Sequence, residues 1–251
     1  MSGIARRGGM AMIALLTLAA PAAAQSRSER FWIGVSGGGQ GTSNGFSDAF
    51  QFASQFQDPE SSRASVDYPV KGGPLVDGTF AVRLWKGFGV GIGVSHFSKR
   101  GSATVTAQVP HPFQLNQFRS IEGSTSTSRN ELGIHLQFAY LVPLTDRLRV
   151  IAFAGPSRLS VEQTVITDVQ YTQSFPFDTA AFSGATTRRA SANAIGVNGG
   201  VDVIWMFSRQ FGVGGLVQYS AAQVREDVGN NRRVTVDAGG IQAGAGLRMV
   251  F

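Results

Sequence analysis

The final stretch of the chain, residues 241–251, reads IQAGAGLRMVF and alternates between two kinds of side chain. One set holds the bulky apolar residues, which are Ile241, Leu247, Met249 and Phe251. The other set is small or polar, and consists of Gln242, Gly244, Gly246 and Arg248. A period of two is typical of a β-strand whose faces meet different surroundings. Most chains fray at their ends, so a strand that finishes on an aromatic residue predicts a terminus held in a sheet.

The same alternation recurs along most of the chain and predicts eight strands. The connections between them alternate as well, between short turns and long polar segments. The short turns lie at 86–87, 143–147 and 207–210, and the long segments lie near 42–74, 98–125, 160–188 and 224–233. This rhythm is typical of an up-and-down transmembrane barrel with tight periplasmic turns and longer outer loops. An even number of strands places both chain ends on the periplasmic side.

The beginning of the chain has the composition of an export signal. Arg6 and Arg7 precede the apolar run MAMIALLTLAA, and Ala22 and Ala24 occupy the small-residue positions of a cleavage site. We therefore predict a cleaved signal peptide over 1–24 and a single barrel domain over 25–251. An uncleaved membrane anchor is the alternative interpretation. The chain has no cysteine, which excludes a lipid anchor on that residue and any disulfide.

A soluble β-sandwich would also alternate, so further features decide between the two architectures. The predicted export signal comes without disulfides, and the long connections fall at every second position. The alternates on the less apolar face are mostly small or uncharged polar residues, which suit a narrow lumen. Trp32, Trp85 and Trp205 all fall at predicted periplasmic strand ends, as in an aromatic belt. The predicted fold class is all-β, an eight-stranded antiparallel up-and-down transmembrane β-barrel.

On these features the chain resembles the small outer membrane β-barrel superfamily, which includes the OmpA-type transmembrane barrel. The resemblance implies location in the bacterial outer membrane, with its lipids as partners. It also implies that a C-terminal aromatic with apolar residues at alternate positions is read by the barrel-assembly machinery. Leu247, Met249 and Phe251 match that signal.

Charged and polar alternates on the lumen face are candidates for an interior network. They are Asp77, Arg83, Arg129, Glu131, His135, Asn198, Asp202, Gln218, Gln242 and Arg248. Charges buried in a narrow barrel must pair, so Arg129 with Glu131, and the two aspartates with Arg83 and Arg248, are expected to form ion pairs. Eight strands leave an interior just wide enough to be filled by side chains. A plugged interior is therefore favoured over a narrow channel.

One motif suggests catalysis. His96 and Ser98 resemble the His-x-Ser pair of the lipid A 3-O-deacylase barrels, where histidine is the base for a serine nucleophile that works with a glutamate. Lys99 stands where that family has asparagine, and the first acidic residue to follow is Glu122. The motif is short, so the chain is predicted not to be an enzyme, with a lipid A acyl hydrolase as the alternative.

Other function classes find no support in the composition. Three histidines lie far apart and cysteine is absent, so no metal or other cofactor is expected. The basic residues are scattered despite a net charge of +6, which argues against a nucleic-acid partner. The predicted role is a structural or surface-interaction platform that presents four outer loops to an unidentified surface ligand.

Overall fold

A computed structural model describes residues 30–41, 45–54, 60–229 and 232–251, and it is built of antiparallel strands. The predicted signal peptide lies outside these residues. Within them, no helix has the length and apolar character that a membrane crossing needs. The strands are β1 (Phe31–Gly41), β2 (Phe46–Phe52), β3 (Ser62–Tyr68), β4 (Gly73–Trp85), β5 (Phe88–His111), β6 (Gln114–Pro143), β7 (Leu148–Gln173), β8 (Ala180–Met206), β9 (Phe211–Gly229) and β10 (Arg232–Val250).

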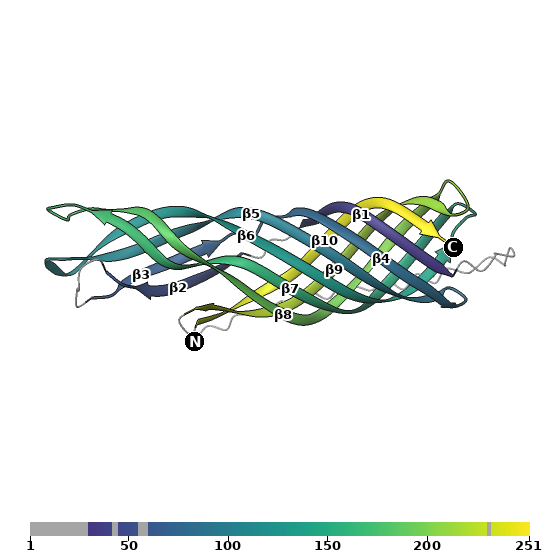
Figure 1. Cartoon of the computed structure of the whole chain (residues 1–251), viewed down its shortest axis with the longest axis horizontal. Helices are drawn as coiled ribbons and strands as arrows, with labels where there is room; N and C mark the ends of the chain where they lie inside the picture. The colour runs from purple at the N-terminus through teal and green to yellow at the C-terminus, as the bar shows by residue number, and fades with distance from the viewer. Residues whose placement is uncertain (1–29, 42–44, 55–59, 230–231) are drawn as a thin grey trace, which may run out of the picture.

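The strands make one sheet in the order β2-β3-β5-β4-β1-β10-β9-β8-β7-β6, and pairing of β5 with β6 closes it into a ring. Strands β2 and β3 lie outside the ring, so eight strands form the barrel, as the sequence predicted. The ring strands run obliquely to the long axis of the molecule, and the short turns gather at one end (Figure 1). Closure leaves no unpaired edge in this part of the sheet, which is the condition for crossing lipid.

The first and last strands form the seam of the barrel. β1 and β10 pair from Trp32 with Val250 to Gly41 with Ile241. The backbones of Phe31 and Phe251 extend this pairing, because each amide N–H donates to the other residue's carbonyl at 3.0 Å. The C-terminal residue is thus hydrogen-bonded rather than frayed, as the alternation of the final stretch predicted.

Four of the ring strands are far longer than a membrane crossing requires. β5, β6, β7 and β8 contain 24, 30, 26 and 27 residues, against the roughly 9–11 that a tilted crossing needs. The segments predicted as outer loops near 98–125 and 160–188 are therefore mostly strand, and the prediction of loops there is wrong. The same holds for the described residues of the predicted loop near 224–233, which belong to β9 and β10. The segment near 42–74 also contains β2 and β3, and β3 pairs with the outer part of β5.

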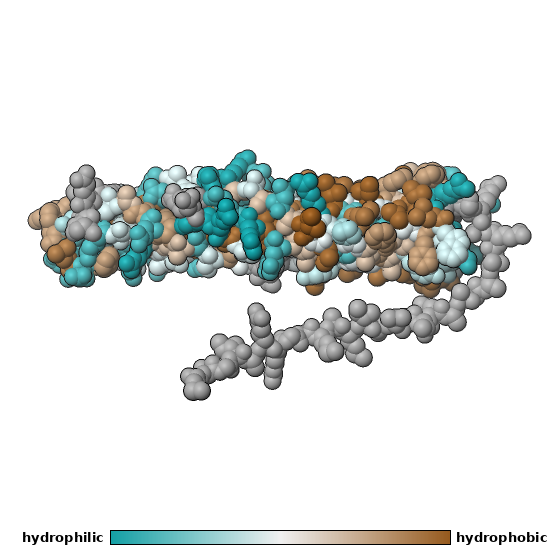
Figure 2. Space-filling model, turned by 90° about the horizontal axis from the view of Figure 1, so that it is seen from below, coloured by the Kyte–Doolittle hydropathy of each residue, from teal (hydrophilic) through white to brown (hydrophobic). Residues whose placement is uncertain are grey.

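Hydrophobic side chains cover the outside of the half of the molecule that carries the C-terminus. Figure 2 shows them as the brown area at the right, whereas polar side chains cover most of the other half. On β9 this belt runs from Phe211 to Tyr219, close to the roughly 9–11 residues of a tilted crossing. Its members on other strands include Val35, Phe80, Ile92, Ile134, Phe138, Val201, Trp205 and Leu247. A large exposed apolar surface of this kind is stable against lipid.

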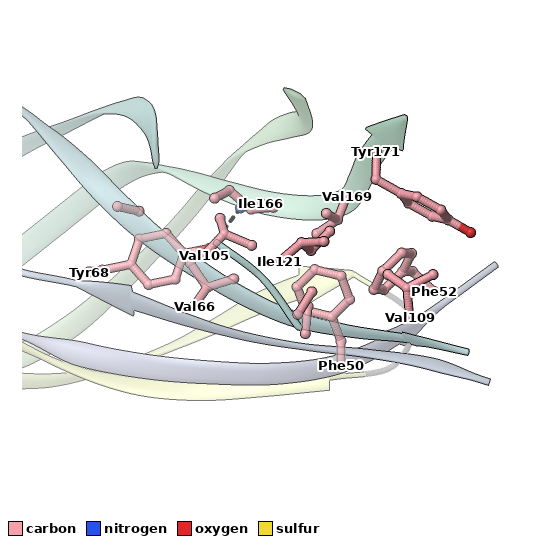
Figure 3. Packing of buried hydrophobic residues seen from close by; sticks show 13 residues of the cluster. Phe50, Phe52, Val66, Tyr68, Val105, Val109, Ile121, Ile166, Val169 and Tyr171 are labelled. Carbon is pink, nitrogen blue, oxygen red and sulfur yellow. Dashed lines mark hydrogen bonds between the residues drawn. The ribbon is translucent and has the colours of Figure 1, made fainter. Parts of the chain in front are cut away.

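Beyond the belt the barrel continues as an extension with a core of its own, built from β2, β3, β5, β6 and β7. Phe50, Val66, Val105 and Ile166 lie in this core, and Figure 3 shows how they pack together. The hydroxyl of Tyr68 accepts a hydrogen bond from the amide of Ile166 at 2.8 Å, which joins β3 to β7. The extension thus has an apolar inside and a polar outside, as a water-soluble protein does.

Candidate functional site

The periplasmic end of the lumen is filled by apolar side chains. Trp32 is 5% exposed and packs with Leu141, Phe153, Ile204 and Val250. The sequence predicted Trp32 in the lipid-facing aromatic belt, and that prediction is wrong, because its parity on β1 turns it inward. Trp85 and Trp205 are exposed, in keeping with a belt. The interior is therefore not uniformly polar, since an apolar layer closes its lower end.

An ion pair lies next to this apolar layer, on the side that faces away from the periplasmic end of the lumen. Arg248 on β10 donates from Nε and Nη2 to the two carboxylate oxygens of Asp202 on β8, at 2.6 and 2.9 Å. The pair spans β9, where a Cβ at Gly214 would lie 2.8 Å from Arg248 Nε and 2.9 Å from Asp202 Oδ1. Glycine at that position therefore provides the room for the ion pair. The cavity that remains beside the pair has a volume of only about 40 Å³.

A separate series of hydrogen bonds crosses the lumen on the outer side of this ion pair. Gln218 donates to Asp77 Oδ2 at 3.4 Å and to the side chain of Gln242. Gln242 donates to Gln40 Oε1 at 2.7 Å, and Gln40 donates to Glu131 Oε2 at 3.1 Å. These contacts join β4, β9, β10, β1 and β6 through the interior.

The series ends at an ion pair near the outer edge of the apolar belt. Arg129 Nε donates to Glu131 Oε1 at 2.7 Å, and Arg129 Nη2 donates to the carbonyl of Asp237 at 2.6 Å. Both side chains of the pair are buried. Further hydrogen bonds stabilise a buried charge pair, and the two bonds of Arg129 fix the position of its guanidinium.

A second group of polar side chains joins the strands on the other side of the lumen. His135 is fully buried, with Nε2 at 2.9 Å from Ser95 Oγ and Nδ1 at 2.7 Å from Ser157 Oγ. Asn198 donates to Ser157 Oγ at 2.9 Å. These contacts join β5, β6, β7 and β8, so the two groups together connect every strand of the ring.

Three of the candidate residues from the sequence, Arg83, Ser98 and His96, lie apart from this interior network. Arg83 donates to the carbonyl of Lys86 at the periplasmic turn, so the structure does not place it with Asp77 and Asp202. The nearby chain reversal provides an acceptor closer than the lumen carboxylates. Ser98 Oγ donates to Asn130 Oδ1 at 2.8 Å, and both lie on the outer surface of the wall. His96 is exposed on the same surface, at the edge of the apolar belt.

A buried carboxylic acid lies in the extension, outside the membrane-spanning part of β9. Glu226 is fully buried, and its Oε2 accepts a hydrogen bond from Gln163 Nε2 at 2.5 Å. Its Oε1 has no hydrogen-bond partner among the described residues. Burial raises the pKa of the Glu226 carboxyl to about 7, against the lowering effects of Gln163 and Arg129.

This raised pKa predicts a pH-dependent stability. The carboxyl binds a proton in the folded barrel up to about pH 7 but loses it near pH 4.5 when unfolded. Stability should therefore fall as the pH rises from about 4.5 to about 7, by on the order of 2–3 kcal/mol. Urea unfolding across that range measures this loss, and Glu226→Gln should remove most of it. An equal pH slope in both proteins would contradict the assignment.

The far end of the extension carries exposed aromatic and aliphatic side chains. Phe113, Leu115 and Phe175 are 73%, 71% and 82% exposed. They lie on or beside the turns that join β5 to β6 and β7 to β8, at the left end of the molecule in Figure 1. Hydrophobic surface reappears at that end in Figure 2. The sequence predicted the outer connections as interaction elements but did not single out these residues.

Contacts between the two turns hold this surface in place. Arg119 is buried and donates to the carbonyls of Phe177 at 2.7 Å and Pro110 at 2.6 Å. The rings of Phe113 and Phe177 lie 5.6 Å apart in an edge-on arrangement. His111, between two prolines in the sequence, packs edge-on against Phe113. The tip is therefore a connected surface formed by both hairpins.

Comparison with known proteins identifies the fold. No model of a known family matches the chain, and no curated protein sequence matches it. Among solved structures, the outer membrane protein OprG from Pseudomonas aeruginosa matches with a TM-score of 0.50 at 11% identity, over 89% of this chain and 96% of that one. The outer membrane protease OmpT from Escherichia coli matches with a TM-score of 0.45 at 10% identity, over 91% and 99%.

The likeness to OprG concerns the fold, since the sequences share few residues. It agrees with the ring of eight strands and with the apolar belt around the lower half of the barrel. Both features were predicted from the alternating sequence. The chain therefore has the fold of an outer membrane β-barrel, and its belt of exposed apolar side chains suits contact with membrane lipid.

Proposed function

We propose that the protein is a surface-interaction protein of the outer membrane, in which the barrel is the anchor and the extension presents a binding tip. The observation that carries the proposal is the exposure of Phe113, Leu115 and Phe175 at the end farthest from the apolar belt. Apolar side chains gathered on a water-exposed surface mark sites of interaction. Aromatic residues are also the side chains that contribute most at protein interfaces.

The rigidity of the tip supports a binding role. A loop that is ordered only on binding loses affinity because its conformational entropy must be removed. The tip is instead built on paired strands and held by Arg119, so little of that cost arises. A recognition surface with this organisation favours a partner that offers apolar or aromatic groups.

The double substitution Phe113→Ser with Phe175→Ser tests the proposal. Adhesion of expressing cells to surfaces coated with extracellular matrix proteins or with neighbouring cells should fall about tenfold or more, because two aromatic contacts are removed. Gln108→Ser with Gln117→Ser alters exposed polar side chains of the same hairpin and serves as the control. Folding of each variant is checked by heat-modifiable gel migration. Equal adhesion by the aromatic variant and the wild type would refute the role of the tip.

The alternative of a narrow channel leads to a separate prediction. The apolar layer around Trp32 and the Asp202–Arg248 pair fill the lower lumen and leave about 40 Å³ of free volume. Reconstituted barrel in planar bilayers should therefore show no steady conductance. Steps of constant size that persist at pH 7 would contradict a filled interior, and their loss in a Gly214→Val variant would assign them to this lumen.

The proposal assigns no catalytic role to His96 and Ser98. The described contact of Ser98 Oγ is a hydrogen bond to Asn130, not to an imidazole that could remove its proton.

The proposal also includes insertion of the barrel by the barrel-assembly machinery through recognition of the C-terminal strand. Leu247 and Phe251 are exposed and Met249 is half-buried, so the alternate side chains are presented outward on a strand at the seam.

A further inference from the structure

Strand β5 changes its neighbouring strand where the apolar belt ends, from β4 to β3. On one side of β5, pairing with β4 ends at Leu75 with Phe97, and pairing with β3 begins at Asp67 with Thr104. The intervening part of β5, residues 98–103, faces the connection that leads from β3 to β4 rather than a paired strand. A cavity of about 170 Å³ lies at this junction, well above the roughly 10–15 Å³ that a water molecule requires.

Apart from Phe46, Pro69, Val70, Gly101 and the amide of Gln163, the residues that line this cavity are cationic or carry hydroxyl groups. The cations are Lys71, Lys99, Arg100 and Arg129. The hydroxyl groups belong to Tyr68, Ser102, Thr127, Ser128 and Thr164. Among the described residues that line the cavity there is no carboxylate. Such a lining offers hydrogen-bond donors and positive charge together, which suits an anion.

One of these cations is buried with an unused donor. Arg129 is 5% exposed, its Nε is bonded to Glu131, and its Nη2 is bonded to the carbonyl of Asp237. Its Nη1 is buried and has no hydrogen-bond partner in the part of the chain that the structure describes. A buried N–H group without an acceptor is costly, so an oxygen of a bound anion at this position would be stabilised. The two other bonds fix the guanidinium in advance.

The position of the cavity relative to the membrane shows from where an anion could reach it. Val76 and Val94 are exposed members of the apolar belt, and Lys99 and Arg100 follow shortly after on β5. The cavity therefore lies at the level where lipid headgroups meet water on the outer side of the membrane. Arg100 and Ser102 are exposed on the outer surface, so the cavity can be approached from the headgroup layer or from the medium.

We propose that this cavity is a binding site for a phosphate monoester group, held by Arg129 and Lys99 from the inner side of the wall and by the exposed Lys71 and Arg100 from the outside. A phosphate group has the acceptor oxygens that guanidinium and ammonium donors bind best. Both a lipid headgroup and a dissolved phosphorylated compound contain this group. The site is independent of the aromatic tip and of the surface role proposed for it.

The experiment uses the barrel domain in phosphatidylcholine nanodiscs, titrated with inorganic phosphate and with glucose 6-phosphate and followed by calorimetry. A second arm compares nanodiscs that contain phosphatidic acid, a lipid with a phosphate monoester, by counting lipid molecules that remain bound in mass spectrometry. Lys99→Gln with Arg100→Gln should weaken saturable binding about tenfold or more. Arg100 is exposed and Lys99 is half-buried, so the variant should fold, which heat-modifiable migration verifies.

The control is Arg225→Gln with Arg233→Gln, which removes the same charge from exposed positions of β9 and β10. Binding of the dissolved phosphates that is lost in the first variant and kept in the control supports the site with a soluble ligand. Selective retention of phosphatidic acid with the same pattern supports it with a lipid ligand. No saturable binding in either arm, or equal losses in both variants, overturns the proposal.

Discussion

Replacing Arg248 by methionine should lower the free energy of unfolding of the barrel by about 3–5 kcal/mol. The substitution removes both hydrogen bonds to Asp202 and leaves the carboxylate buried without its cation. Asp77 lies close enough to Arg248 to interact with it electrostatically, so the substitution would also remove a favourable positive charge from beside Asp77. Urea unfolding in lipid vesicles, followed by tryptophan fluorescence and by gel migration, measures the loss.

A double variant separates the stranded carboxylate from the lost contacts. Asp202→Leu with Arg248→Met replaces the pair by apolar side chains of similar size, next to the apolar layer of Ile204 and Val250. Such replacements are often neutral or stabilising, so the double variant should recover most of the loss. A double variant as unstable as Arg248→Met alone would mean that the pair itself, and not the uncompensated charge, determines the stability.

The outer extension shows where the sequence pattern was misread and why. Along the lower part of β5, Ile92 and Val94 face lipid while small residues face the lumen. Along its outer part, Val105 and Val109 face inward while threonines face water. The inside of the wall keeps its parity throughout, but the apolar set changes from outside to inside at the membrane surface. A reading that expects apolar residues only toward lipid therefore takes the outer part for a polar loop.

The alternation with a period of two predicted the barrel, because it assigns every side chain of a strand to the lipid face or to the lumen face. It did not predict which side chains contact each other inside the lumen. Arg129 and Glu131 are two residues apart on β6, so sequence reasoning could pair them. Gln40 and Glu131 come from strands that meet only across the lumen, and the shear of the barrel decides their height. The tip and the phosphate cavity likewise depend on which turns and connections lie side by side.

At the seam between β1 and β10 the sequence determines how closely the two backbones approach, as well as which face each side chain is on. Gly38 is the example. A Cβ on Gly38 would lie 2.0 Å from the carbonyl oxygen of Ala243 and 2.5 Å from the Cα of Gly244. Both obstructions are backbone atoms of β10, which cannot rotate away as a side chain does. Gly38 therefore allows β10 to approach β1 closely where the barrel closes.

Gly38→Val should prevent stable closure of the barrel, because β1 and β10 must separate at this point to accept the side chain. The loss should exceed the roughly 1–3 kcal/mol of ordinary overpacking, since backbone must move rather than side chains. Gly37→Val is the matched control, because the adjacent Gly37 is exposed and a Cβ there has nothing within 4 Å. The control should migrate as the compact heat-modifiable form, and the Gly38 variant as the unfolded form without heating. Compact migration by both would show that the seam tolerates a wider spacing, and would leave pairing of Phe31 with Phe251 as the main determinant of closure.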